Sequence, residues 1–91
     1  MYGLLTGKKA LVTGAAQGIG KAVALIYAQN GADVILCDIN DIKVKAAARE
    51  IADATGQQCF GLKMDITSKT DASVAVAYAV HTLGSLDILC N

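Results

Sequence analysis

Three glycines follow a short apolar run near the start of the chain, at Gly14, Gly18 and Gly20. Gly14 allows the chain to turn sharply away from a strand, and Gly18 removes the side chain that would keep a phosphate from the main chain. Gly20 allows the following helix to pack tightly on a sheet. Free N–H groups at the start of that helix attract an anion, and the helix dipole adds about 0.3–1 kcal/mol. The spacing predicts a pyrophosphate site, with a simple reversal of the chain as the alternative.

A carboxylate, Asp38, ends the next apolar run, eighteen residues beyond Gly20. Dinucleotide sites place an acidic side chain about 20 residues after the glycine turn, where a hydrogen bond to a ribose hydroxyl contributes about 1.5–3 kcal/mol. The 2′-phosphate of NADP would be repelled there by about 4 kcal/mol per charge pair at about 4 Å. Gln17 is neutral, and no cation comes between Asp38 and Lys43. We therefore expect NAD in preference to NADP; a solvated strand end or a helix cap is the alternative role for Asp38.

The pattern of a phosphate loop in nucleoside triphosphatases does not fit these residues. That pattern requires a glycine where Ala15 stands and a hydroxyl side chain after the lysine, where Ala22 stands. The glycine turn therefore disfavours a nucleoside triphosphatase.

Four apolar runs predict strands at residues 10–13, 34–37, 59–64 and 86–90. Runs of this length that do not alternate strictly suit strands buried on both faces of a parallel sheet. The segments between them have helical spacing, and each ends at a glycine. Such crossovers are right-handed, so the sequence predicts an α/β fold with an open parallel sheet. The residues at helical spacing are Ile19, Val23 and Ile26 in the first helix, a buried stripe of Val44, Ala48 and Ile51 in the second, and a stripe of Val76, Val80 and Leu83 in the third.

The helix starts carry capping side chains. Asn40 or Asp41 can cap the second helix, and Thr67 or Ser68 can cap the third.

Composition limits the class of protein. The 91 residues are 54% hydrophobic, with eight basic and eight acidic side chains, which predicts one small folded domain. The absence of a basic cluster argues against nucleic acid or a membrane surface as a partner. No apolar run approaches the roughly 18 residues of a membrane span, and residues 1–6 do not resemble a secretory signal. Three cysteines without metal-site spacing predict buried, reduced thiols in a cytoplasmic protein, with a metal or redox role as the alternative.

Three segments together resemble the short-chain dehydrogenase/reductase family. The stretch TGAAQGIG at residues 13–20 resembles the family's cofactor turn, and Asp65-Ile66 resembles its adenine-contacting pair. LDILCN at residues 86–91 is similar to the family's LDILVN, which opens the Asn-Asn-Ala-Gly segment after the fourth strand. The resemblance implies an incomplete Rossmann-type sheet in the order 3-2-1-4 with helices on both faces, in which residues 1–91 are the N-terminal dinucleotide-binding part of a single domain. The cofactor-binding residues that it implies are Gly14, Gln17, Gly18, Ile19, Gly20, Asp38, Ile39, Asp65, Ile66 and Asn91.

Some of these residues also have structural interpretations. Ile19 can be a core residue, Ile66 a packing residue and Asn91 an amide that stabilises the sheet. Asp65 can cap the third helix instead of contacting a base.

The family's catalytic pattern is a Tyr-x-x-x-Lys pair with a serine, helped by an asparagine. Tyr2, Tyr27 and Tyr78 are each followed four residues later by threonine or glycine, and His81 is expected at the surface. The resemblance thus implies the front part of an NAD-dependent oxidoreductase that transfers hydride between NAD and an alcohol or carbonyl substrate. The parent is expected to be a homo-oligomer, and the isolated chain is expected to be inactive. The alternative is a nucleotide-binding or interaction module, complete in itself.

Overall fold

The structure, a computed structural model, describes residues 3–91, so Tyr2 lies outside the described residues. Its four strands form one parallel sheet in the order β3-β2-β1-β4, which confirms the expected fold and strand order. The strands are β1 (Lys9–Thr13), β2 (Asp33–Asp38), β3 (Cys59–Lys63) and β4 (Ile88–Cys90).

Strand β4 is shorter than the predicted run of residues 86–90. The Asp87 carboxylate accepts a hydrogen bond from the Lys9 N–H at 2.9 Å, and the Asp87 N–H donates to the Lys9 carbonyl at 2.8 Å. Because the Asp87 side chain accepts from the Lys9 N–H, the regular pairing of β4 with β1 begins only at Ile88, opposite Ala10.

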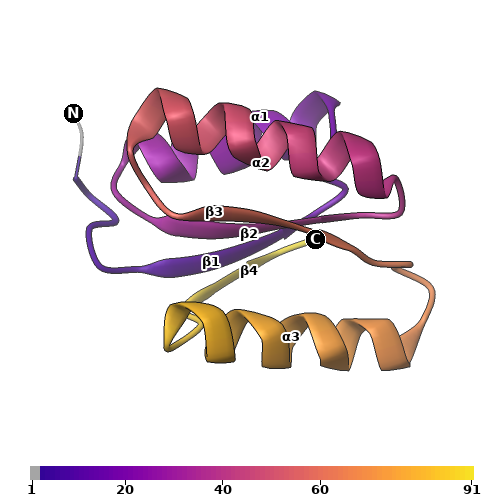
Figure 1. Cartoon of the computed structure of the whole chain (residues 1–91). Helices are drawn as coiled ribbons and strands as arrows, with labels where there is room; N and C mark the ends of the chain where they lie inside the picture. The colour runs from indigo at the N-terminus through magenta and orange to yellow at the C-terminus, as the bar shows by residue number, and fades with distance from the viewer. Residues whose placement is uncertain (1–2) are drawn as a thin grey trace.

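Three helices cover the sheet on both faces. They are α1 (Gly18–Gln29), α2 (Asp41–Thr55) and α3 (Lys69–Leu83). Figure 1 shows α1 and α2 on one face and α3 alone on the other. Alternate residues of β2 face opposite ways: Val34 and Leu36 pack with α1 and α2, whereas Ile35 and Cys37 pack with α3. The burial of both faces explains why the central strands are continuous apolar runs.

Alanines form much of the contact between the helices and the sheet. The predicted stripe of α2 is confirmed, because Val44, Ala48 and Ile51 are buried. For α3 the predicted stripe is wrong at Val76 and Val80, which are 39% and 44% exposed.

The buried residues of α3 are instead Ala75 and Ala79. A methyl side chain lets the helix backbone come close to Leu11 and Ile35 of the sheet, and this close approach turns the larger valines outward. Leu83 of the predicted stripe does pack, partly buried, against the same cluster.

Side-chain caps fix the starts of the two later helices. The Asn40 carboxamide oxygen accepts from the Lys43 N–H at 3.0 Å at the start of α2. The Ser68 hydroxyl accepts from the Asp71 N–H at 3.1 Å at the start of α3. The alternative role of Asp65 as the cap of α3 is therefore wrong.

An ion pair ties β1 to β2 at the amino-terminal edge of the sheet. The Lys9 ammonium pairs with the Asp33 carboxylate, which also accepts from the Gln57 amide at 3.1 Å and from the Gln58 N–H at 3.0 Å. Burial raises the pKa of Asp33, but the hydrogen bonds from Lys9 and Gln58 outweigh it and hold that pKa below its usual value. This cluster stabilises the edge opposite the glycine turn.

In the part of the chain that the structure describes, none of the helices has both the length and the apolar character needed to cross a membrane.

Candidate functional site

The loop between β1 and α1 leaves its main chain uncovered. Gly14 and Gly18 have positive φ angles of 62° and 64°, a conformation that strains other residues. A Cβ atom added to either glycine would meet no heavy atom of residues 3–91 within 4 Å. The space above both glycines is therefore open, as a ligand that contacts the backbone requires.

Gly20 has a different role, because it lies against the protein itself. A Cβ atom there would be 2.1 Å from the Gly14 carbonyl oxygen and 3.1 Å from the Thr13 oxygen. The first turn of α1 thus packs directly on the glycine turn, in the role the sequence predicts for this residue.

Asp38 holds the glycine loop against the end of β2. One oxygen of its carboxylate accepts from the Ala16 N–H at 3.2 Å, and the other accepts from the Asn40 N–H at 3.0 Å. The Ala15 N–H also donates to the Cys37 carbonyl, at 3.0 Å. Asp38 is therefore neither a solvated strand end nor the cap of α2. Each carboxylate oxygen keeps further acceptor capacity for a ligand.

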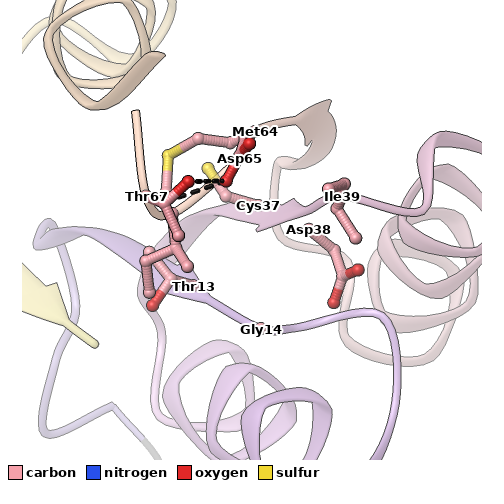
Figure 2. A pocket seen from close by; sticks show the side chains of 9 residues that line it. Thr13, Gly14, Cys37, Asp38, Ile39, Met64, Asp65 and Thr67 are labelled. Carbon is pink, nitrogen blue, oxygen red and sulfur yellow. Dashed lines mark hydrogen bonds between the residues drawn. The ribbon is translucent and has the colours of Figure 1, made fainter. Parts of the chain in front are cut away.

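A cavity of about 360 Å³ opens at the carboxyl-terminal ends of β1, β2 and β3. Figure 2 shows its lining side chains, with Asp38 and Ile39 on one side and Met64, Asp65 and Thr67 on another. Ile39 and Ile66 are 62% and 63% exposed, so Ile66 is not mainly a packing residue. The residues that line the cavity are Thr13, Gly14, Cys37, Asp38, Ile39, Met64, Asp65, Ile66 and Thr67.

Asp65 is fixed by a short turn that the sequence analysis missed. Its carboxylate accepts from the Thr67 hydroxyl at 2.7 Å and from the Thr67 N–H at 2.9 Å. These two hydrogen bonds lower the pKa of Asp65, so the group is ionised at neutral pH. The signal in the sequence is the spacing of Asp65 and Thr67, which is typical of an Asx turn. The Asp65 N–H donates to the Asp71 carboxylate at 2.9 Å and so connects this turn to α3.

Gln17 and Ile19 lie at the start of α1, next to the open glycines. Ile19 is 85% exposed, so its interpretation as a core residue is wrong. Gln17 is the N-cap residue of α1, but its side chain makes no capping hydrogen bond to the described residues. Its carboxamide oxygen instead accepts from the Lys43 ammonium at 2.9 Å. The spacing of Gln17 and Lys43 in the sequence does not predict this contact.

Asn91 lies apart from the first cavity. It lines a second hollow of about 170 Å³, between α3 and the strands, which shares Thr13 and Met64 with the first. The predicted residues that the structure brings into one cavity are Gly14, Asp38, Ile39, Asp65 and Ile66. Asn91 lies beside this cavity, and the predicted residues of the loop and first turn of α1 that do not line it are Gln17, Gly18, Ile19 and Gly20.

The arrangement has the features of a ligand-binding site. Open main chain at a helix start suits an anion, and a carboxylate at a strand end suits a sugar hydroxyl. Burial raises the pKa of the Cys37 thiol to about 12, so this cysteine in the cavity wall is protonated at neutral pH.

The strand order and the glycine loop at the end of β1 place the chain among the Rossmann-type α/β proteins. The sequence profile of the family described as short chain dehydrogenase matches residues 8–91, and the chain belongs to that family.

Curated relatives are similar over nearly the whole chain. The chain is 44% identical over 89 residues to "Oxidoreductase UcpA" of Salmonella typhimurium, which covers 98% of this chain and 33% of the relative. It is 41% identical over 87 residues to "7alpha-hydroxysteroid dehydrogenase" of Escherichia coli K12, which covers 96% of this chain and 34% of the relative. The chain therefore spans about a third of the length of the curated relatives it matches.

Solved structures agree with this assignment. A short chain dehydrogenase from Mycobacterium smegmatis superposes with a TM-score of 0.92 at 32% identity, over 97% of this chain and 37% of that one. A 7 alpha-hydroxysteroid dehydrogenase complexed with NADH and 7-oxo glycochenodeoxycholic acid superposes with a TM-score of 0.88 at 41% identity, over 93% of this chain and 33% of that one.

Proposed function

We propose that the chain is the NAD-binding portion of an oxidoreductase that transfers hydride between NAD and an alcohol or carbonyl substrate. One observation carries the proposal: the Asp38 carboxylate reaches the glycine loop, where it accepts from the Ala16 N–H. The loop and the carboxylate therefore act on one ligand, which needs both an anionic group and a ribose. Membership of the short chain dehydrogenase family and a neighbour with bound NADH support this ligand.

The residues fit a dinucleotide. The bare backbone at Gly14 and Gly18 would accept the diphosphate, and Gly20 keeps the start of α1 close to it. Asp38 would accept hydrogen bonds from the adenosine ribose, and the charge of its carboxylate opposes a 2′-phosphate, so NAD is preferred over NADP. When bound, NAD would supply the nicotinamide ring that accepts or donates the hydride.

The other predicted residues would orient the two ends of the cofactor. Ile39 and Ile66 offer exposed apolar surface in the cavity, on which an adenine ring can lie. The Asp65 carboxylate and the Ile66 N–H would contact the edge of the base. Gln17 and Ile19 would line the pyrophosphate and nicotinamide side of the turn, and Asn91 would lie near the adenosine ribose.

Catalysis needs residues that these 91 do not supply. Tyr27 and Tyr78 lack a lysine four residues later, and so does Tyr2. We propose that this chain alone binds cofactor without turning over substrate, within a cytoplasmic, homo-oligomeric parent that acts on a small alcohol or carbonyl compound.

Isothermal titration of the chain with NAD and with NADP tests the proposal. The wild-type chain should bind NAD more tightly, and Asp38→Asn should reduce that preference. Asp53→Asn is the matched control, because Asp53 is an exposed carboxylate near the far end of α2. Equal binding of NAD and NADP by the wild-type chain would contradict the predicted preference.

A further inference from the structure

Lys43 reaches back from the first turn of α2 to the glycine loop. Its ammonium donates to the Gln17 carboxamide oxygen at 2.9 Å. Its own N–H is held by the Asn40 cap at 3.0 Å, and the Asn40 N–H is held by the Asp38 carboxylate at 3.0 Å. Two consecutive hydrogen bonds, through Asn40, thus connect the backbone of Lys43 to the carboxylate proposed to bind the ribose.

The charge of Lys43 is not neutralised within the described chain. The salt bridges among residues 3–91 pair other lysines with carboxylates, and the neighbouring acid Asp41 pairs with Lys45. Within residues 3–91 the Lys43 ammonium donates a hydrogen bond only to the neutral Gln17 amide. An anion can displace this amide, because its charge adds a Coulomb attraction to the ammonium that a neutral amide oxygen does not provide.

The Lys43 ammonium and the Asp38 carboxylate contact adjacent residues of the glycine loop. Asp38 contacts the backbone of Ala16, and Lys43 contacts the side chain of Gln17. Lys43 is five positions after Asp38 in the sequence, and this spacing alone does not predict that both side chains contact the loop. The turn into α2 brings them there.

We propose that Lys43 is a second cofactor-selectivity residue, which binds a 2′-phosphate on the adenosine ribose once the charge of Asp38 is removed. The inference rests on the proposed cofactor site. If Lys43 binds the 2′-phosphate, only the charge of Asp38 opposes NADP. A single substitution of Asp38 would then make the Lys43 ammonium available to the phosphate.

The test uses adenosine 2′,5′-bisphosphate and 5′-AMP as probes, titrated by calorimetry at low ionic strength. The variants are Asp38→Asn alone and Asp38→Asn combined with Lys43→Gln, Lys43→Arg or Lys45→Gln. Asp38→Asn alone should bind the bisphosphate about tenfold more tightly than its combination with Lys43→Gln. Lys43→Arg and the control Lys45→Gln should retain that affinity, and 5′-AMP should bind all four variants alike.

Two results would overturn the inference while leaving the cofactor site in place. One is an equal loss of bisphosphate affinity with Lys43→Gln and Lys45→Gln, which would indicate a general charge effect. The other is a parallel loss of 5′-AMP affinity with Lys43→Gln, which would make Lys43 a support for the loop through Gln17. If neither the wild-type chain nor any variant binds 5′-AMP, the proposed function fails together with the inference. Circular dichroism of each variant verifies that it is folded.

Discussion

Replacing Gly20 with alanine tests how closely α1 packs on the glycine turn. Helix propensity alone predicts that alanine stabilises the helix by about 1 kcal/mol. The structure predicts the opposite, because the new Cβ would lie 2.1 Å from the Gly14 carbonyl oxygen and 2.7 Å from its carbon. Both atoms belong to the backbone, so the helix and the loop must separate by more than an ångström.

Overpacking of this kind costs about 1–3 kcal/mol, and a contact with rigid backbone belongs in the upper part of that range. After subtraction of the propensity gain, Gly20→Ala should lower the free energy of unfolding by about 1–2 kcal/mol. Urea denaturation followed by far-ultraviolet circular dichroism measures this difference.

Ala22→Gly is the matched control, because Ala22 is exposed on the same helix. Its substitution changes helix propensity without changing a buried contact. It should cost about 1 kcal/mol. A Gly20→Ala variant as stable as the wild-type chain, or more stable, would refute the close packing of α1 on the turn.

Two further predictions concern ionisation. The pKa of Asp33 is lowered in the folded chain, because the ion pair with Lys9 and other hydrogen bonds outweigh burial. This contribution to stability is therefore complete above about pH 4 and is lost as the pH falls through the lower, folded pKa. Asp33→Asn should weaken the loss of stability between neutral and acid pH in urea denaturation, and an unchanged pH profile would contradict this. Burial also raises the pKa of Cys37 to about 12 and that of Cys59 to about 11, so a thiol-disulfide reagent at pH 8 should titrate only the half-buried Cys90 in the native chain and all three cysteines in guanidinium. Rapid native reaction of all three thiols would show that the two buried cysteines are accessible.

The sheet and the position of the cavity at its carboxyl-terminal edge could be predicted because they depend on local signals and on a general rule of topology. Continuous apolar runs identified the four strands, and parallel neighbours bring their carboxyl ends to one edge. In this sheet the last residue of β1, Thr13, pairs with Cys37 near the end of β2. This pairing brings Asp38 to the glycine loop, although eighteen residues separate it from Gly20.

The helix faces are harder to predict, because the stripe of large apolar residues is not the face that packs on the sheet. In α1 the buried residues are Ala24 and Ala28, whereas Ile26 is 54% exposed. Close packing of a helix on a sheet selects small side chains, so the stripe of largest hydrophobicity need not be the buried one.

The contacts of Lys43 and Thr67 depend on how side chains leave a turn, which spacing alone does not determine. Lys43 contacts Gln17 only because the Asn40 cap fixes the first turn of α2. The contact of Thr67 is predictable from Asp65 two residues earlier, since an aspartate side chain commonly accepts from the backbone N–H two residues on.

The most direct test of cofactor binding is an NMR titration of the ¹⁵N-labelled chain with NAD. The largest amide shifts should occur at Gly14, Gly18, Ile39 and Ile66, and the amide of Asp87 at the opposite edge should be unaffected. No shift at these four amides, or the largest shifts at the amino-terminal edge, would contradict NAD binding by the glycine loop and the strand ends.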